Sequence, residues 1–143
     1  MTRIIACVSG KGGAGKTTLV ANLGIALARM GKDVTVIDAN LTTPNLGLHL
    51  GVPLSPITIH DVLKGKANIA QAIYRHESGL KVIPAGIALK DLKGVDARDL
   101  STAILDLLGN TEIVLIDAAA GLGREALAAV EASDEMLLIT NPP

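Results

Sequence analysis

The sequence contains very few aromatic residues and almost no cysteine. Its 143 residues include one tyrosine, Tyr74, and neither phenylalanine nor tryptophan. The hydrophobic core must therefore be aliphatic, and a platform of stacked aromatic rings for single-stranded nucleic acid cannot form. The one cysteine, Cys7, allows neither an intrachain disulfide nor a four-cysteine metal site in one copy of the chain. We expect a reducing compartment and no iron–sulfur cluster.

The sequence also lacks an excess of charge and a long apolar run. Because 13 Lys and Arg residues stand against 14 Asp and Glu residues, the formal charge is -1, and we do not expect a nucleic-acid partner. Charged residues such as Asp106 and Glu125 interrupt the apolar stretches before any reaches the roughly 18 residues that span a membrane. The first residues lack the pattern of a signal peptide, so we expect a cytoplasmic protein.

Short β-branched apolar runs alternate with longer segments whose apolar residues recur at helical spacing. This alternation predicts one α/β domain over residues 1–143, with a mostly parallel sheet and helices on both of its faces. We expect strands at residues 3–9, 34–37, 80–83, 112–116 and 135–140. We expect helices at residues 16–30, 58–63, 97–108 and 124–132.

Two of these helices carry clear apolar stripes. The predicted buried face of the first helix consists of Leu19, Leu23, Leu27 and Met30, and Gly31 is expected to end this helix as a left-handed cap. The stripe of the helix at residues 97–108 is expected in the core, not as a membrane anchor. The last strand is followed by residues 141–143 with no helix to cover it, so we expect the chain to be truncated at its C-terminus.

The strongest chemical signal lies between the first strand and the first helix, where the chain fits the pattern G-x-x-x-x-G-K-[ST]. The residues are Gly10, Lys11, Gly12, Gly13, Ala14, Gly15, Lys16 and Thr17. Glycines let backbone NH groups surround phosphate oxygens, and the helix N-terminus adds the positive end of its dipole. We expect Lys16 to bind the β and γ phosphates of a nucleotide, Thr17 to bind Mg²⁺, and Thr18 to contact the phosphates. The alternative, a glycine-rich turn, does not require Lys and Thr at the start of the helix.

A second signal is the apolar run at residues 113–116, which ends in Asp117. An acid at the end of such a strand can hold Mg²⁺ through its water shell, opposite the phosphate loop. The alternative is a strand-end acid that caps a turn. Gly121 and Gly123 follow in a loop whose NH groups we expect near a γ-phosphate.

Lys11 adds a second lysine to the phosphate loop, and the resulting KGGAGKTT resembles the deviant Walker A motif. The segments VIDAN, PNLGL and IDAAAGLG, at residues 36–40, 44–48 and 116–123, also resemble the MinD/ParA ATPases, and MinD-like septum-site proteins most of all. The resemblance implies a three-layer P-loop NTPase fold, with ATP and Mg²⁺ as cofactors. It also implies an ATP-dependent homodimer in which Lys11 reaches the partner's nucleotide. The alternative for Lys11 is a solvated loop lysine.

Two residues depart from the family pattern. Asn40 stands where the family usually has a second acid, and since an amide offers no base, slow turnover is expected. A plain turn residue is the other interpretation of Asn40. Ala119 replaces the usual proline, which frees the backbone of that loop. Asp38 remains and is expected to organise the water shell of Mg²⁺.

The resemblance implies a slow, dimeric switch ATPase that acts in division-site selection or cellular positioning, with Lys11, Lys16, Asp38 and Asn40 as catalytic residues. Its partner would be a protein activator or a membrane-associated protein, and a C-terminal segment of the family kind would place it at the inner membrane face. The alternatives are a nucleotide-gated binding protein that hardly hydrolyses, because of Asn40, and a DNA-partitioning ATPase, which needs a basic surface. His49, His60 and His76 fit no local metal motif, and we expect them on loops or helix surfaces.

Overall fold

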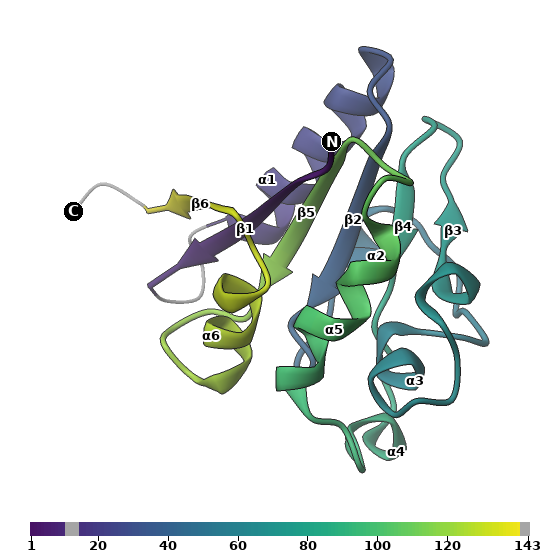
Figure 1. Ribbon diagram of the computed structural model, residues 1–143, viewed down its shortest axis with the longest axis vertical. Helices are drawn as coiled ribbons and strands as arrows, with labels where there is room; N and C mark the ends of the chain where they lie inside the picture. Colours follow the sequence, from purple (N-terminus) through teal and green to yellow (C-terminus); the bar gives the residue numbers. More distant parts are fainter. Residues whose placement is uncertain (11–14, 141–143) are drawn as a thin grey trace.

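Six strands form one sheet in the order β3-β4-β2-β5-β1-β6 (Figure 1). The structure is a computed structural model that describes residues 1–10 and 15–140. The strands are β1 (Arg3–Ser9), β2 (Val34–Ala39), β3 (Tyr74–Arg75), β4 (Lys81–Ile83), β5 (Ile113–Ala118) and β6 (Glu135–Ile139). All neighbouring strands run parallel except β3 and β4. The five predicted strands are confirmed, and β3 is an additional antiparallel edge strand.

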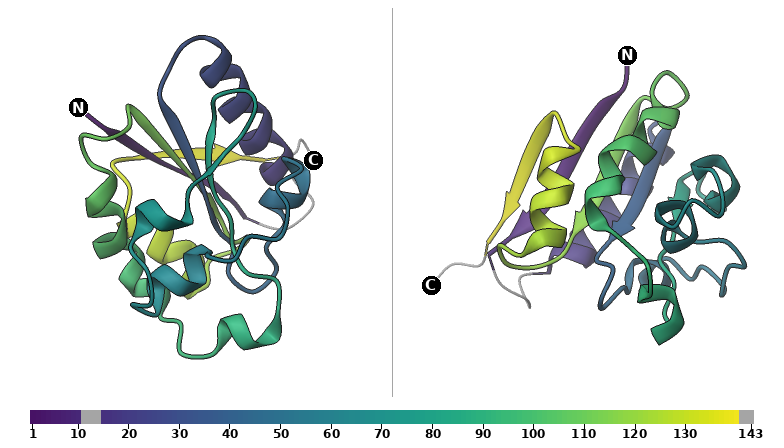
Figure 2. Two further views of the ribbon diagram at one scale, coloured as in Figure 1. Left: turned by 90° about the vertical axis from the view of Figure 1, so that its right-hand side faces the viewer. Right: turned by 60° about the horizontal axis from the view of Figure 1, so that its bottom comes forward.

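Helices cover both faces of this sheet. The α-helices are α1 (Lys16–Arg29), α2 (Leu46–His49), α3 (Ile59–Leu63), α4 (Leu89–Leu92), α5 (Leu100–Ile104) and α6 (Arg124–Glu131). Helix α1 lies behind the sheet in Figure 1, whereas α5 and α6 lie side by side in front of it (Figure 2). This arrangement confirms the predicted three layers. Among the helices of residues 1–10 and 15–140, none is long and apolar enough to cross a membrane.

The core consists of two aliphatic clusters, one on each face of the sheet. The cluster under α1 includes Cys7, Val36 and Leu115. The cluster under α3, α5 and α6 includes Ile37 and Ile116. Successive residues of β2 and β5 therefore alternate between the two faces, and both faces are buried, as expected for the central strands of a parallel sheet.

The predicted buried face of α1 is only partly right: Leu23 and Leu27 pack against the core cluster on that face, but Leu19 and Met30 do not. The helix buries Val20, Ala21 and Gly24, whereas Leu19 is 41% exposed and Met30 is 71% exposed. Small residues allow the helix axis to approach β2 closely, because a Cβ at Gly24 would lie only 2.9 Å from Cγ1 of Val36. The predicted helix end is confirmed, since Gly31 has a φ of 88°.

The segment predicted as one helix at residues 97–108 forms three consecutive pieces. A 3-10 turn, Ala97–Asp99, leads into α5, and a second 3-10 turn, Leu105–Leu107, follows it. Leu100, Ile104 and Leu107 are buried in the cluster on that face of the sheet. These three residues of the stripe belong to the core, as predicted, whereas Leu108, predicted on the same stripe, is 44% exposed.

Candidate nucleotide site

The described ends of the phosphate loop have the predicted geometry. The loop leaves β1 at Gly10 and enters α1 at Gly15, whose φ of 79° lies in the left-handed region that favours glycine. The carbonyl of Gly15 accepts the first helical hydrogen bond, from the NH of Leu19. Lys11, Gly12, Gly13 and Ala14 lie outside the described residues, so their roles in binding phosphate and a second subunit stay predictions.

Lys16, Thr17 and Asp117 form a cluster where α1 begins. The ammonium group of Lys16 forms an ion pair with Oδ1 of Asp117, and both side chains are buried. The hydroxyl of Thr17 donates to Oδ2 of the same carboxylate at 2.9 Å. Asp117 faces α1 because Leu115, two residues earlier on β5, packs on that face. The two sequence signals therefore meet at one point, as the motif spacing requires.

Asp38 lies beside this cluster, at the position of β2 that pairs directly with Asp117 on β5. Its Oδ1 accepts the NH of Asn40 at 3.0 Å, and its Oδ2 accepts the NH of Leu46 at 3.2 Å. Burial, followed by the charge of Asp117, raises the pKa of Asp38 to about 7. The two backbone NH groups and Lys16 oppose this rise. Asp38 thus holds the loop that follows β2 in shape, and its predicted part in catalysis stays a prediction.

Asn40 forms a closed turn with Thr43. Its amide Nδ2 donates to the carbonyl of Thr43 at 3.0 Å, and its Oδ1 accepts the Thr43 hydroxyl at 3.2 Å. This is the turn that precedes the short helix α2, as one interpretation of the sequence predicted. Asn40 also lines a cavity beside the phosphate loop. The residue therefore forms this turn and belongs to the candidate site as well.

The cavity beside the phosphate loop has a volume of about 300 Å³. It brings Lys16, Thr17, Thr18 and Asn40 together, whereas Asp38 and Asp117 are not among its lining residues. Its lining residues are Ser9, Gly15, Lys16, Thr17, Thr18, Asn40, Thr43, Asn45, His49 and Ala120. Thr43, Asn45 and His49 were not predicted at the site, although each follows Asn40 closely in the loop after β2 or on α2.

The loop after β5 is attached to the end of β1 and to the loop after β2. The NH of Gly121, predicted near a γ-phosphate, donates to the carbonyl of Ser9 at 3.0 Å. Glu125, in the first turn of α6, accepts the NH of Thr42 at 3.1 Å and the hydroxyl of Thr42 at 2.8 Å. Glu125 therefore joins the loop after β2 to the start of α6, the helix that follows the loop after β5.

The residues at this cluster fit a magnesium ion. The hydroxyl of Thr17 and the carboxylate of Asp117 offer oxygen atoms, which Mg²⁺ prefers. Within residues 1–10 and 15–140 there is no group of three or more His, Cys, Asp and Glu side chains able to hold a metal. A nucleotide-bound Mg²⁺ needs only one or two protein ligands, because phosphate and water complete its octahedron.

Burial raises the pKa of the neighbouring Cys7 thiol to about 11, which leaves it neutral.

His60 is not on a helix surface as predicted. The side chain is fully buried, and both ring nitrogens form hydrogen bonds to backbone groups. No local pattern predicts this burial, because α3 is short and His60 follows Ile59 in an otherwise ordinary apolar pattern.

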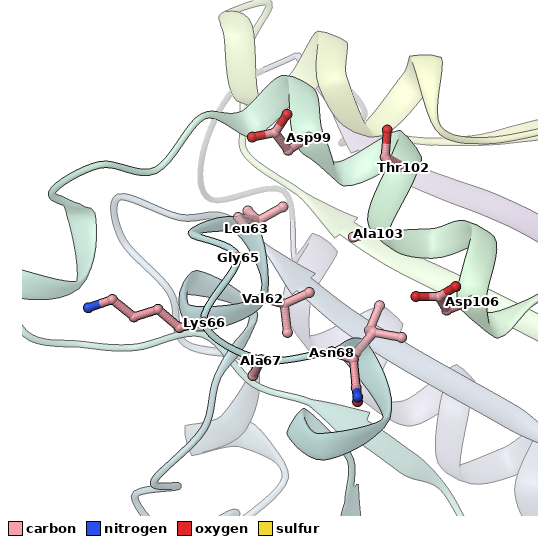
Figure 3. A pocket seen from close by; sticks show the side chains of 11 residues that line it. Val62, Leu63, Gly65, Lys66, Ala67, Asn68, Asp99, Thr102, Ala103 and Asp106 are labelled. Atoms are coloured by element: carbon pink, nitrogen blue, oxygen red, sulfur yellow. The ribbon is translucent and has the colours of Figure 1, made fainter.

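A larger cavity, of about 600 Å³, lies between α3 and α5 (Figure 3). Asp99, Thr102 and Asp106 lie on one side of it, and Val62 and Leu63 on the other. None of the phosphate-loop residues that the structure describes lines this cavity. We therefore place the candidate nucleotide site at the smaller cavity.

The comparison with known proteins agrees with this geometry. A family model described as an AAA domain matches residues 2–142. MinD from Pyrococcus horikoshii, solved with Mg-ADP, is 44% identical and superposes with a TM-score of 0.96, covering 100% of this chain and 59% of that chain. The chain belongs to the MinD/ParA family of P-loop ATPases.

Curated relatives of this MinD/ParA chain include proteins of archaea and bacteria. An uncharacterised ATP-binding protein of Methanocaldococcus jannaschii is 43% identical over 142 residues, which cover 99% of this chain and 54% of that protein. The septum site-determining protein MinD of Thermotoga maritima is 36% identical over 146 residues, which cover 99% of this chain and 53% of that protein. The chain therefore spans about half the length of these relatives.

Proposed function

We propose that this chain is the nucleotide-binding part of a MinD/ParA switch ATPase that binds Mg-ATP and hydrolyses it slowly. The observation that carries the proposal is the cluster of Lys16, Thr17 and Asp117 at the start of α1. The Mg-ADP in the related Pyrococcus horikoshii MinD supports the choice of an adenine nucleotide. The phosphate loop itself recognises phosphate and magnesium, not the base.

Each residue of the cluster has a defined task in this proposal. Lys16 exchanges its ion pair with Asp117 for the β and γ phosphates, where its charge stabilises the developing negative charge. The Thr17 hydroxyl and the Asp117 carboxylate, which are hydrogen-bonded to each other here, are the groups that would hold the magnesium ion. Magnesium held there would supply positive charge that offsets the negative charge of the phosphates. In hydrolysis, water would form a bond to the γ-phosphorus while the bond from the γ-phosphorus to the oxygen of ADP breaks, and the proton lost from water would pass to the released phosphate or to solvent.

The proposed switch acts between two copies of the chain. With ATP bound, Lys11 of each copy reaches the nucleotide of the other, and hydrolysis separates the pair. The closed pair recruits a protein activator or a membrane-associated partner and so marks a position in the cell, such as the division site. The name of the Thermotoga maritima relative supports this role.

One observation favours a second candidate, a nucleotide-gated binding protein with little hydrolysis. Asn40 carries no acid, and its amide is engaged on both sides by Thr43. Such a side chain can orient water but cannot remove its proton. The second candidate shares the nucleotide site and differs only in turnover.

Turnover of Mg-ATP over a range of protein concentrations tests the proposal. Lys16→Ala serves as the blank, and Lys11→Ala tests the second lysine. Specific activity that rises with concentration, disappears in Lys16→Ala and loses its concentration dependence in Lys11→Ala supports the dimeric ATPase. Activity of the wild type equal to the blank, with nucleotide still bound, supports the second candidate.

A further inference from the structure

The ring of His60 joins two loops through opposite nitrogens. Nδ1 lies 2.8 Å from the NH of Gly86 and accepts its hydrogen. Nε2 lies 3.0 Å from the carbonyl of Leu41, so it must carry the ring hydrogen and donate it. The geometry therefore defines a neutral imidazole in one tautomer, completely buried.

These two loops follow the C-terminal ends of two neighbouring strands, β2 and β4, and the candidate site lies at this same end of the sheet. Leu41 comes two residues after β2 ends, and Gly86 comes three residues after β4 ends. The two strands are paired from Thr35↔Lys81 to Ile37↔Ile83. His60 thus links the outer loop, after β4, to the loop that lines the phosphate cavity.

Helix α3, which carries His60, is held in place at its N-terminal end. Helix α3 begins at a capping box in which Asp61 accepts the NH of Thr58 at 2.9 Å. The NH of Ile59 donates to the carbonyl of Pro84 at 2.8 Å, which ties the start of the helix to the end of β4. These contacts attach the helix that carries His60 to the end of β4, independently of the loop after β2.

The loop after β2 is held from both faces of the sheet. Asp38 holds the NH groups of Asn40 and Leu46 on the face of α1. His60 holds the carbonyl of Leu41 on the opposite face, where Leu41 and Ile59 belong to the same apolar cluster. Asn40, which Asp38 holds directly, and Thr43, between Leu41 and Leu46, both line the phosphate cavity.

We propose that His60 is a positioning residue of the nucleotide site: by holding the carbonyl of Leu41, it sets where Asn40 and Thr43 stand against the phosphates. This inference rests on the proposed function, because it assigns His60 a part in nucleotide binding. A residue that served the fold alone would stabilise the domain without a preference between its two hydrogen bonds. A positioning residue depends on the bond to Leu41.

Two substitutions separate the two hydrogen bonds. His60→Gln places an amide donor near the position of Nε2 and can keep the bond to Leu41, whereas His60→Asn places an acceptor near Nδ1 and can keep the bond to Gly86. Both lose packing around the ring. We expect Mg-ATP to bind about tenfold more weakly to the Asn variant than to the Gln variant, a ratio typical of one buried hydrogen bond.

Hydrogen exchange in the absence of nucleotide gives an independent measurement. The amide of Thr42 should exchange faster in His60→Asn than in His60→Gln, because only the Asn variant releases the neighbouring carbonyl. Equal exchange and equal affinity in the two variants would overturn the role of His60 and leave the proposed function intact. If the wild type binds no Mg-ATP, the proposed function fails, and the role of His60 at the site fails with it.

If both variants unfold, the tautomer of His60 in the wild-type protein can still be measured by nitrogen NMR of its ring. The inference requires the neutral Nε2–H tautomer of His60. Signals of the Nδ1–H tautomer, or of a charged ring at neutral pH, would overturn it, since neither can accept the hydrogen of Gly86.

Discussion

Asp38 and Asp117 face one another across β2 and β5 as directly paired residues, and both side chains are buried. The single cation of this cluster, among the residues the structure describes, is Lys16, and it is paired with Asp117. Asp38 instead receives two backbone NH groups. The two aspartates therefore have different roles. Asp117 pairs with the phosphate-loop lysine, and Asp38 holds the backbone of the loop after β2.

The raised pKa of Asp38 predicts that stability falls as pH rises. Below its ordinary pKa of 3.8, Asp38 is protonated in both the folded and the unfolded chain. Between this value and about 7, the folded protein keeps the proton and the unfolded chain releases it. The free energy of unfolding should fall across this window, by up to about 1.4 kcal/mol per pH unit.

Asp38→Asn removes this titration and should flatten that part of the profile. Urea unfolding of both proteins between about pH 4 and pH 8, with a chelator present, measures the two slopes. The slopes are compared, not the absolute stabilities, because an amide cannot accept both NH groups that Asp38 accepts. Identical slopes would contradict a protonated Asp38 in the folded protein.

Asn40→Asp should increase ATP turnover. The acid can take a proton from water, a contribution that typically amounts to about 10²-fold, although it gives up the hydrogen bond that the amide donates to Thr43. Steady-state turnover at saturating Mg-ATP measures the change. Asn110→Asp, on an exposed loop away from the site, is the control. An unchanged rate in Asn40→Asp would show that hydrolysis is limited elsewhere.

Glu125→Ala should loosen the connection between the loops after β2 and β5. Both hydrogen bonds from Thr42 end on this carboxylate, and we expect a loss of about 1 kcal/mol in the free energy of unfolding and faster exchange of the Thr42 amide. Glu131→Ala, an exposed acid at the other end of α6, is the matched control. Equal effects of the two substitutions would argue against the connection.

Much of this fold follows from residue patterns because its strands and first helix are long enough to show a clear period. Strands β1, β2 and β5 read as β-branched apolar runs, and Gly31 ended α1 as a left-handed cap. Strand β3, with only Tyr74 and Arg75, is too short to show any alternation. Pairing with β4, a tertiary contact, makes it a strand.

The buried face of α1 could not be predicted from hydrophobicity alone. Leu19 and Met30 are more apolar than Gly24, yet it is Gly24 that meets the sheet. A close approach of helix and strand favours the smallest side chain at the contact. The distance between the helix and the sheet is set by tertiary packing, so it cannot be predicted from the sequence of the helix alone.

The candidate site, too, contains some residues that could be predicted from local sequence patterns and others that could not. The cluster of Lys16, Thr17 and Asp117 could be predicted, because the phosphate loop and a strand-end acid are local patterns that parallel strands bring to one edge. The hydrogen bonds of His60 and Glu125 join segments that are distant in the chain. They depend on tertiary packing and have no local pattern.

Gly24→Ala tests the close approach of α1 and β2. Alanine favours the helix by about 1 kcal/mol, but its Cβ would lie 2.9 Å from Cγ1 of Val36, so we expect a net destabilisation of about 1–3 kcal/mol. Asn22→Ala, at an exposed position of the same helix, should be neutral or stabilising. Thermal unfolding of both variants measures the difference, and a stabilised Gly24→Ala would contradict the packing described.

Calorimetric titration of Mg-ATP into the wild type, Lys16→Ala and Lys66→Ala tests the central claim, that the chain binds a nucleotide at the start of α1. Lys66 lines the larger cavity, so its variant is a control for binding there. We predict one nucleotide per chain in the wild type and in Lys66→Ala, and a loss of at least about 100-fold in affinity in folded Lys16→Ala, typical of a lost charge-assisted contact to phosphate. Unchanged affinity in Lys16→Ala would contradict the assignment of the site.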